Sequence, residues 1–94
     1  MIRSKVVPED EQAHYWHVVE RCLTAFHGLT KGAARKKVRH CQEEVEQLPQ
    51  ATAELFFHAE PFDVACRIAG RELDPTPFLT RYLQIRDQPT EGEE

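Results

Sequence analysis

Hydrophobic residues recur every three or four positions along most of the chain, which is the period of an amphipathic α-helix. Proline and glycine residues divide this pattern into separate segments. We expect five helices, over residues 8–27, 30–48, 49–60, 61–70 and 75–87. No stretch of useful length alternates apolar and polar positions as a half-buried strand does. The sequence therefore predicts an all-α fold.

The expected boundaries coincide with residues that start or stop helices. Gly28 and Gly70 suit helix C-termini because glycine readily adopts the left-handed backbone found there. Thr30 and Asp74 suit the N-cap position, and Pro49 disfavours helical geometry in the residue before it. Because the turn after Gly28 is short, we expect the first two helices to form an antiparallel hairpin on which three shorter helices pack.

The apolar stripes of these helices predict the hydrophobic core. On the second helix, apolar residues follow one another at steps of four, three, four and three, which is the spacing of a packed helix pair. Cys22 and Cys41 lie on the facing stripes and are expected to be small buried side chains. The expected core comprises Trp16, Val19, Cys22, Phe26, Val38, Cys41, Val45, Leu55, Phe56, Phe62, Ile68, Leu79 and Leu83.

Length and composition indicate one small globular domain. The chain has 94 residues, of which 40% are hydrophobic and 30% are charged, and these fractions are ordinary for a globular protein. We assign residues 1–87 to a single helical domain. Residues 88–94 are polar and acidic and have no period, so we expect a disordered tail.

Charge and cysteine content narrow the class of protein. The net charge of −4 argues against general nucleic-acid binding, which depends on Lys and Arg contacts to phosphates. No segment approaches the about 20 apolar residues of a membrane span, and the first residues have no apolar core of a signal peptide. Three widely spaced cysteines are typical of reduced thiols, so we expect a cytoplasmic protein.

Residues 14–28 concentrate histidines and therefore raise the question of a metal site. On a helical wheel the histidines lie outside the apolar stripe while Cys22 lies in its middle, so these side chains diverge. We predict no tightly bound metal and no other cofactor. If a metal were bound, the available imidazole and carboxylate ligands would be His14, His17, Glu54 and His58.

The sequence contains none of the motifs that would indicate catalysis. It has no glycine-rich phosphate loop, no nucleophile elbow, and neither a CxxC nor an HExxH motif. We therefore expect a protein that is not an enzyme.

The second helix has basic residues in its first half and acidic residues in its second half, which opposes the helix dipole. Lys31, Arg35 and Arg39 form a short cationic stripe that would suit an acidic partner, including the acidic tail of the same chain. The alternative is a solvated face with pairs such as Arg39 and Glu43, each contributing only a few tenths of a kcal/mol.

The segment ELFFHAE lies in the helix expected over residues 49–60 and makes that helix apolar on nearly every side. Because a fold of this size can scarcely enclose such a helix, we expect apolar surface near Phe57 to remain available for association. We therefore predict a protein–protein interaction module with Phe57 as an anchor and a protein partner or a second copy as its ligand. The alternative is a helix-turn-helix-like DNA-binding or regulatory protein formed by residues 61–87, although Pro75 and Pro77 occupy the first turn of the presumed recognition helix.

Overall fold

The computed structural model describes residues 9–87, and every regular element in this range is helical. The helices are α1 (Glu9–Phe26), α2 (Lys31–Glu46), α3 (Gln50–Phe56), α4 (Pro61–Ala69) and α5 (Leu79–Asp87), with a 3₁₀ turn η1 (Thr76–Phe78) before α5. The predicted all-α class is therefore confirmed. The expected helix start at Pro8 and the expected disordered tail lie outside the described residues.

The residues expected at helix ends have the geometry that those positions require. Gly28 and Gly70 adopt positive φ angles of 71° and 72°, which favours glycine at each position. The hydroxyl of Thr30 accepts a hydrogen bond of 3.1 Å from the amide of Ala33. A carboxylate oxygen of Asp74 accepts one of 3.0 Å from the amide of Thr76, and this bond lowers the pKa of Asp74.

The third helix is shorter than predicted, because it ends at Phe56 and not near residue 60. The amides of residues 57–59 donate to carbonyls three positions earlier, so the chain tightens before it leaves the helix. The carbonyl of Ala59 instead accepts a 2.9 Å hydrogen bond from the hydroxyl of Tyr15. A side chain of α1 thus holds the end of this segment.

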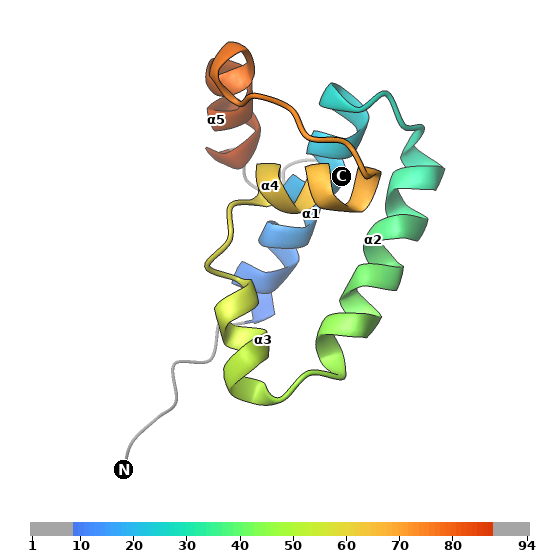
Figure 1. Cartoon of the computed structure of the whole chain (residues 1–94), viewed down its shortest axis with the longest axis vertical. Helices are drawn as coiled ribbons and strands as arrows, with labels where there is room; N and C mark the ends of the chain where they lie inside the picture. Colours follow the sequence, from blue (N-terminus) through green and yellow to red (C-terminus); the bar gives the residue numbers. More distant parts are fainter. Residues whose placement is uncertain (1–8, 88–94) are drawn as a thin grey trace.

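Helix α1 lies at the centre of the fold (Figure 1). It packs most extensively against α4 and also against α2 and α5. In the view of Figure 1, α4 crosses in front of α1, and α3 and α5 lie at opposite ends of the molecule. The α1–α2 hairpin is thus present, but α4 provides the largest packing surface for α1.

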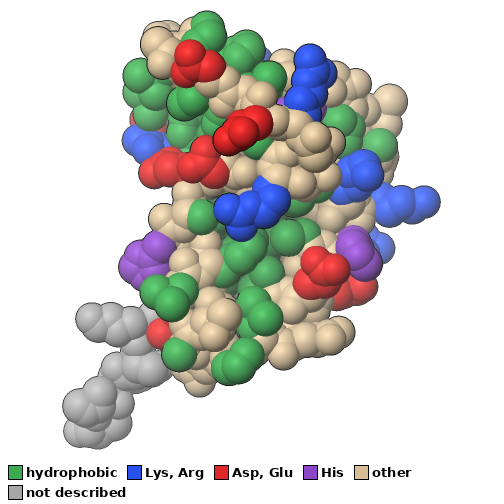
Figure 2. Space-filling model, in the orientation of Figure 1, with side chains coloured by type: hydrophobic (Ala, Val, Ile, Leu, Met, Phe, Trp, Pro, Cys, Tyr) green, Lys and Arg blue, Asp and Glu red, His purple; other side chains and the backbone are tan. Residues whose placement is uncertain are grey.

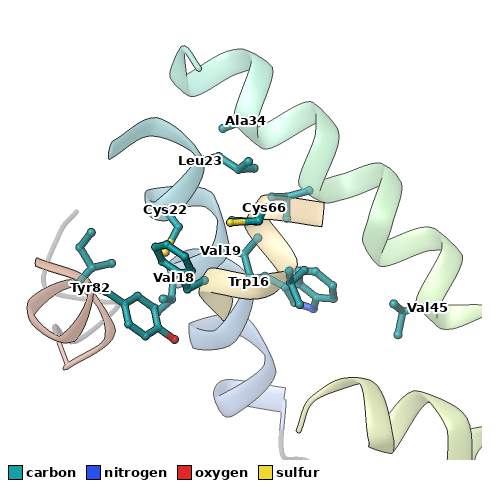
Figure 3. Close-up of a cluster of buried hydrophobic side chains, with 14 residues drawn as sticks. Trp16, Val18, Val19, Cys22, Leu23, Ala34, Val45, Cys66 and Tyr82 are labelled. Carbon is teal, nitrogen blue, oxygen red and sulfur yellow. The ribbon is translucent and has the colours of Figure 1, made fainter. Parts of the chain in front are cut away.

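The core is formed chiefly between α1 and α4 (Figure 3). Cys22, Leu23 and Val19 of α1 are fully buried, and Val64 of α4 is 1% exposed. Tyr82 and Ile85 contribute the buried face of α5. The remaining buried hydrophobic residues are Trp16, Val18, Ala34, Val38, Val45, Phe62, Ala65 and Cys66.

Two residues expected in the core are exposed, and those predictions are wrong. Leu55 is 68% exposed and Leu79 is 50% exposed. Helix α3 is turned so that Phe56 and Phe57 face the aromatic rings of α1, which directs the preceding residue outward at about 100° per position. In the same way, Phe78 packs against the core and leaves Leu79 on the outside. The other expected core residues are buried or packed against the buried cluster.

Candidate functional site

A groove of about 560 Å³ runs between α2 and α4 and ends at α3. We call it the cationic groove. Its apolar floor is formed by Cys41, Phe56, Val64 and Ile68, and its rim by Lys36, Lys37, His40, Glu44 and Arg67. Figure 2 shows hydrophobic side chains gathered where α2, α3 and α4 meet, with Lys and Arg side chains next to them.

The helical period of α2 and α4 places these residues together. On α2, Ala34, Val38 and Val45 face the core, so the residues beside this stripe line the groove. On α4, Val64 is buried while Arg67, one turn later, is exposed. Because α2 and α4 are in contact, the floor and the rim come from helices that are distant in sequence.

The rim of the cationic groove has an excess of positive charge. Within residues 11–87, Lys36, Lys37 and Arg67 take part in no ion pair. Among the described residues of the rim, Glu44 is the single acidic one, and its carboxylate lies 3.3 Å from the His40 ring across one helical turn. This concentration of cations is notable because the chain as a whole has a net charge of −4.

The thiol in the floor is not activated for chemistry. Burial raises the pKa of Cys41, Glu44 raises it further, and Arg67 acts in the opposite direction. Burial also raises the pKa of Cys22 to about 12. A nucleophilic cysteine needs a lowered pKa, so these thiols are protonated packing groups at neutral pH. What the groove offers a ligand is apolar contact and positive charge.

A second hollow of about 620 Å³ lies between α1, α2 and α3, and Phe57 is part of its wall. Phe57 is half-buried and makes edge-to-face contacts with Tyr15 and Trp16 at 5.1 and 5.8 Å between ring centroids. The structure thus places this predicted anchor in an aromatic cluster of its own chain. Among the described residues that line this hollow, none is Lys or Arg, and the charged ones are Glu46 and Glu54.

The predicted cationic stripe lies on α2 but outside the groove. Lys31, Arg35 and Arg39 are exposed, and Arg35 lies 3.5 Å from Glu20 of α1. Sequence reasoning missed the residues that line the groove, above all Arg67. Lys36 and Lys37 could have been identified, since they adjoin the apolar stripe at Val38 and Cys41.

The four residues named as potential metal ligands are not brought into one site. His14 and His58 border the same hollow, but Nε2 of His14 donates a 2.7 Å hydrogen bond to the carbonyl of Arg86. Glu54 instead accepts a bond from Gln50, and His17 does not border the hollow. In the part of the chain that the structure describes, no group of three or more His, Cys, Asp or Glu side chains could hold a metal ion.

The segment proposed as a DNA reader has a long connection between its helices. Residues 70–75 and η1 separate α4 from α5. On α5, Arg86 lies over the Tyr82 ring, within 3.9 Å of Glu60 and 3.5 Å of Asp87. Arg81 is exposed. The DNA-binding alternative stays a prediction. Over its described residues 79–87, helix α5 carries no cluster of unpaired Lys or Arg side chains that would support it.

We found no match to this chain among known protein families, curated proteins or solved structures. None of the helices in residues 9–87 combines the length and the apolar character needed to cross a membrane. The chemistry of the cationic groove is therefore the basis on which a function can be proposed.

Proposed function

We propose that this protein is a non-enzymatic protein–protein interaction module that binds a partner protein in the cationic groove. The observation that supports this proposal is an apolar floor bordered by three cations that form no ion pair with the described residues. Apolar surface bordered by polar residues is characteristic of sites of association. Charged rims raise the rate of encounter and select partners of opposite charge.

The positions of the polar groups favour binding over catalysis. Outside the groove, burial raises the pKa values of Tyr15 and Tyr82, as it does for Cys22. Both hydroxyls join segments of the chain, since Tyr15 donates to the Ala59 carbonyl and Tyr82 donates to Glu60 at 2.7 Å. These tyrosine hydroxyls therefore stabilise the packing of the chain. The three cysteines are free thiols, which is consistent with the cytoplasm, where we expect the protein to act.

Charge reversal inside and outside the groove tests the proposal. The double variant Lys36→Glu/Lys37→Glu changes two exposed rim residues. The matched control Lys31→Glu/Arg39→Glu makes the same change at exposed positions of α2 outside the groove. Each tagged protein would be used to capture proteins from cell extract, with quantitative mass spectrometry, and light scattering over a concentration series would measure self-association.

We expect a specific partner to be captured by the wild type and by the control variant, and its yield to fall about tenfold or more with the groove variant. Equal capture by all three proteins would contradict the assignment of the groove. A failure of both capture and self-association in the wild type would contradict the assignment of an interaction module.

A further inference from the structure

We infer that the segment bound in the cationic groove is an amphipathic α-helix of the partner protein, with Asp or Glu residues on both sides of its apolar stripe. This inference rests on the proposed function and specifies the chemistry of the partner. Three features of the groove support it: its length, its apolar floor and the distribution of its charges.

The length of the groove suits a helix. Its α2 wall extends from Lys36 to Glu44, which is about 12 Å at the helical rise of about 1.5 Å per residue. The anchors of an amphipathic helix at positions i, i+3 or i+4, and i+7 extend over about 10 Å. One apolar stripe of about two turns therefore matches the wall.

The floor also favours a helical ligand. Phe56 and Ile68, which are partly exposed, present apolar surface from α3 and α4, and an extended peptide lying there would leave its backbone N–H and C=O groups without partners. The described residues contain no strand whose edge could supply those hydrogen bonds. A helix satisfies its own backbone and exposes only side chains, so it can bury its apolar stripe on this floor.

The charges lie on both sides and toward one end of the groove. Lys36 and Lys37 border it on α2, and Arg67 borders it on α4. Acidic residues on both flanks of the ligand stripe would therefore meet cations. Glu44 lies at the other end of the α2 wall. Because the C-terminus of a helix carries partial negative charge, the bound helix should run antiparallel to α2, with its C-terminus near Lys36.

Two synthetic helical peptides that differ only in their flanking residues would test the inference. Both would carry leucines at i, i+3, i+4 and i+7; one would have Glu beside the stripe and the other Lys. Fluorescence anisotropy of the labelled peptides would measure their affinities for the full chain and for Lys36→Glu/Lys37→Glu. Lys31→Glu/Arg39→Glu would serve as the control, and a scrambled Glu peptide would show whether the stripe is needed.

We expect the Glu peptide to bind the wild type and the control variant about tenfold more tightly than the Lys peptide does. The order should reverse for the groove variant, and the scrambled peptide should not bind. Increasing ionic strength should weaken binding of the Glu peptide to the wild type, because the rim charges are exposed and are screened by salt.

Equal affinity for the two peptides, or no binding of the Glu peptide, would overturn the inference. If capture of a natural partner still depended on Lys36 and Lys37, the interaction module would stand and only the helical ligand would be wrong. Self-association of the full chain that is lost in the groove variant would identify a second copy as the occupant instead. Binding of monomeric dodecanoate without binding of the Glu peptide would identify an acyl anion.

Discussion

Helices α3 and α4 follow one another in the chain and are of similar length, but they are held in different ways. Helix α4 buries Pro61, Phe62, Val64, Ala65 and Cys66, whereas none of the residues of α3 is buried. Helix α4 lies against the middle of the molecule and makes the principal contact with α1, while α3 lies at one end (Figure 1). The fold therefore depends on α4 far more than on α3.

Half-buried aromatic rings hold α3 in place. Phe56 stacks on Trp16 with 5.5 Å between ring centroids, and Phe57 meets Tyr15 at 5.1 Å. The same two phenylalanines also line grooves on the surface: Phe56 lines the cationic groove and Phe57 lines the hollow between α1, α2 and α3. Helix α4 therefore stabilises the fold, whereas α3 shapes the surfaces around it.

The largest loss of stability is expected for Phe62→Ala in α4. Phe62 is 3% exposed and contacts the rings of Phe26, Phe78 and Tyr82. Removing a buried phenylalanine ring leaves a cavity and costs about 3–5 kcal/mol. Urea denaturation followed by circular dichroism would measure the free energy of unfolding. A loss below about 1 kcal/mol would show that α4 is not the main stabilising element.

A smaller loss is expected for Phe57→Ala at the C-cap of α3, about 2 kcal/mol, because this ring is only half-buried. The same denaturation measurement would give the value, and Phe57→Leu, which keeps apolar volume, should recover part of it. If Phe57→Ala leaves stability unchanged but abolishes partner capture, Phe57 is an interface anchor, as the sequence suggested, and not a support for α3.

One polar defect directly after the C-terminus of α1 should make stability depend on pH. Both ring nitrogens of His27 are shielded from solvent and have no hydrogen-bond partner among the described residues. Burial lowers the pKa of His27, and the charge of Arg71 lowers it further. The unfolded chain therefore binds this proton more readily than the folded one. The free energy of unfolding is therefore not reduced by this titration above about pH 6.5, and it decreases as the pH falls below that value through the lower, folded-state pKa of His27.

The variant His27→Leu should remove this dependence. We expect it to unfold at higher urea concentration than the wild type, by about 1 kcal/mol at neutral pH, because burial of an unpaired polar group is costly. Between about pH 7 and pH 5 it should lose less stability than the wild type. The other histidines are present in both proteins, so their contributions to the pH dependence cancel when the two profiles are compared. A wild type and a variant with parallel pH profiles would exclude His27 as the source.

The smallest effect is expected for Leu55→Ala, within about 0.5 kcal/mol, because Leu55 is 68% exposed. It is the matched control for Phe57→Ala, because Leu55 lies in the last turn of α3 and Phe57 is the C-cap residue of that helix. A loss comparable to that of Phe57→Ala would mean that α3 packs through its other side.

Much of the helical framework could be predicted from the sequence because the signals are local. Gly28, Thr30, Pro49 and Gly70 act on the backbone within a few residues, and the helix boundaries follow them. The rotation of α3 could not be predicted in this way. Three consecutive apolar residues give no preferred side, so the position of the Tyr15 and Trp16 rings decides that Phe56 and Phe57 pack and Leu55 does not.

The residues that line the cationic groove were harder to predict from the sequence, for a related reason. The excess of cations on α2 was evident, but each helix has several polar flanks, and which flank borders a hollow depends on the neighbouring helix. Arg67 joins Lys36 and Lys37 only because α4 packs beside α2, a contact between residues about thirty positions apart in the chain.

The stacking of Trp16 on Phe56 makes the intrinsic fluorescence of the protein sensitive to the position of the Phe56 ring. Trp16 is the single tryptophan of the chain, and it is 7% exposed. Phe56, the ring stacked on it, is also part of the floor of the cationic groove. A ligand that displaces Phe56 changes the surroundings of the indole, so occupancy of the groove should alter the intrinsic fluorescence of the unlabelled protein.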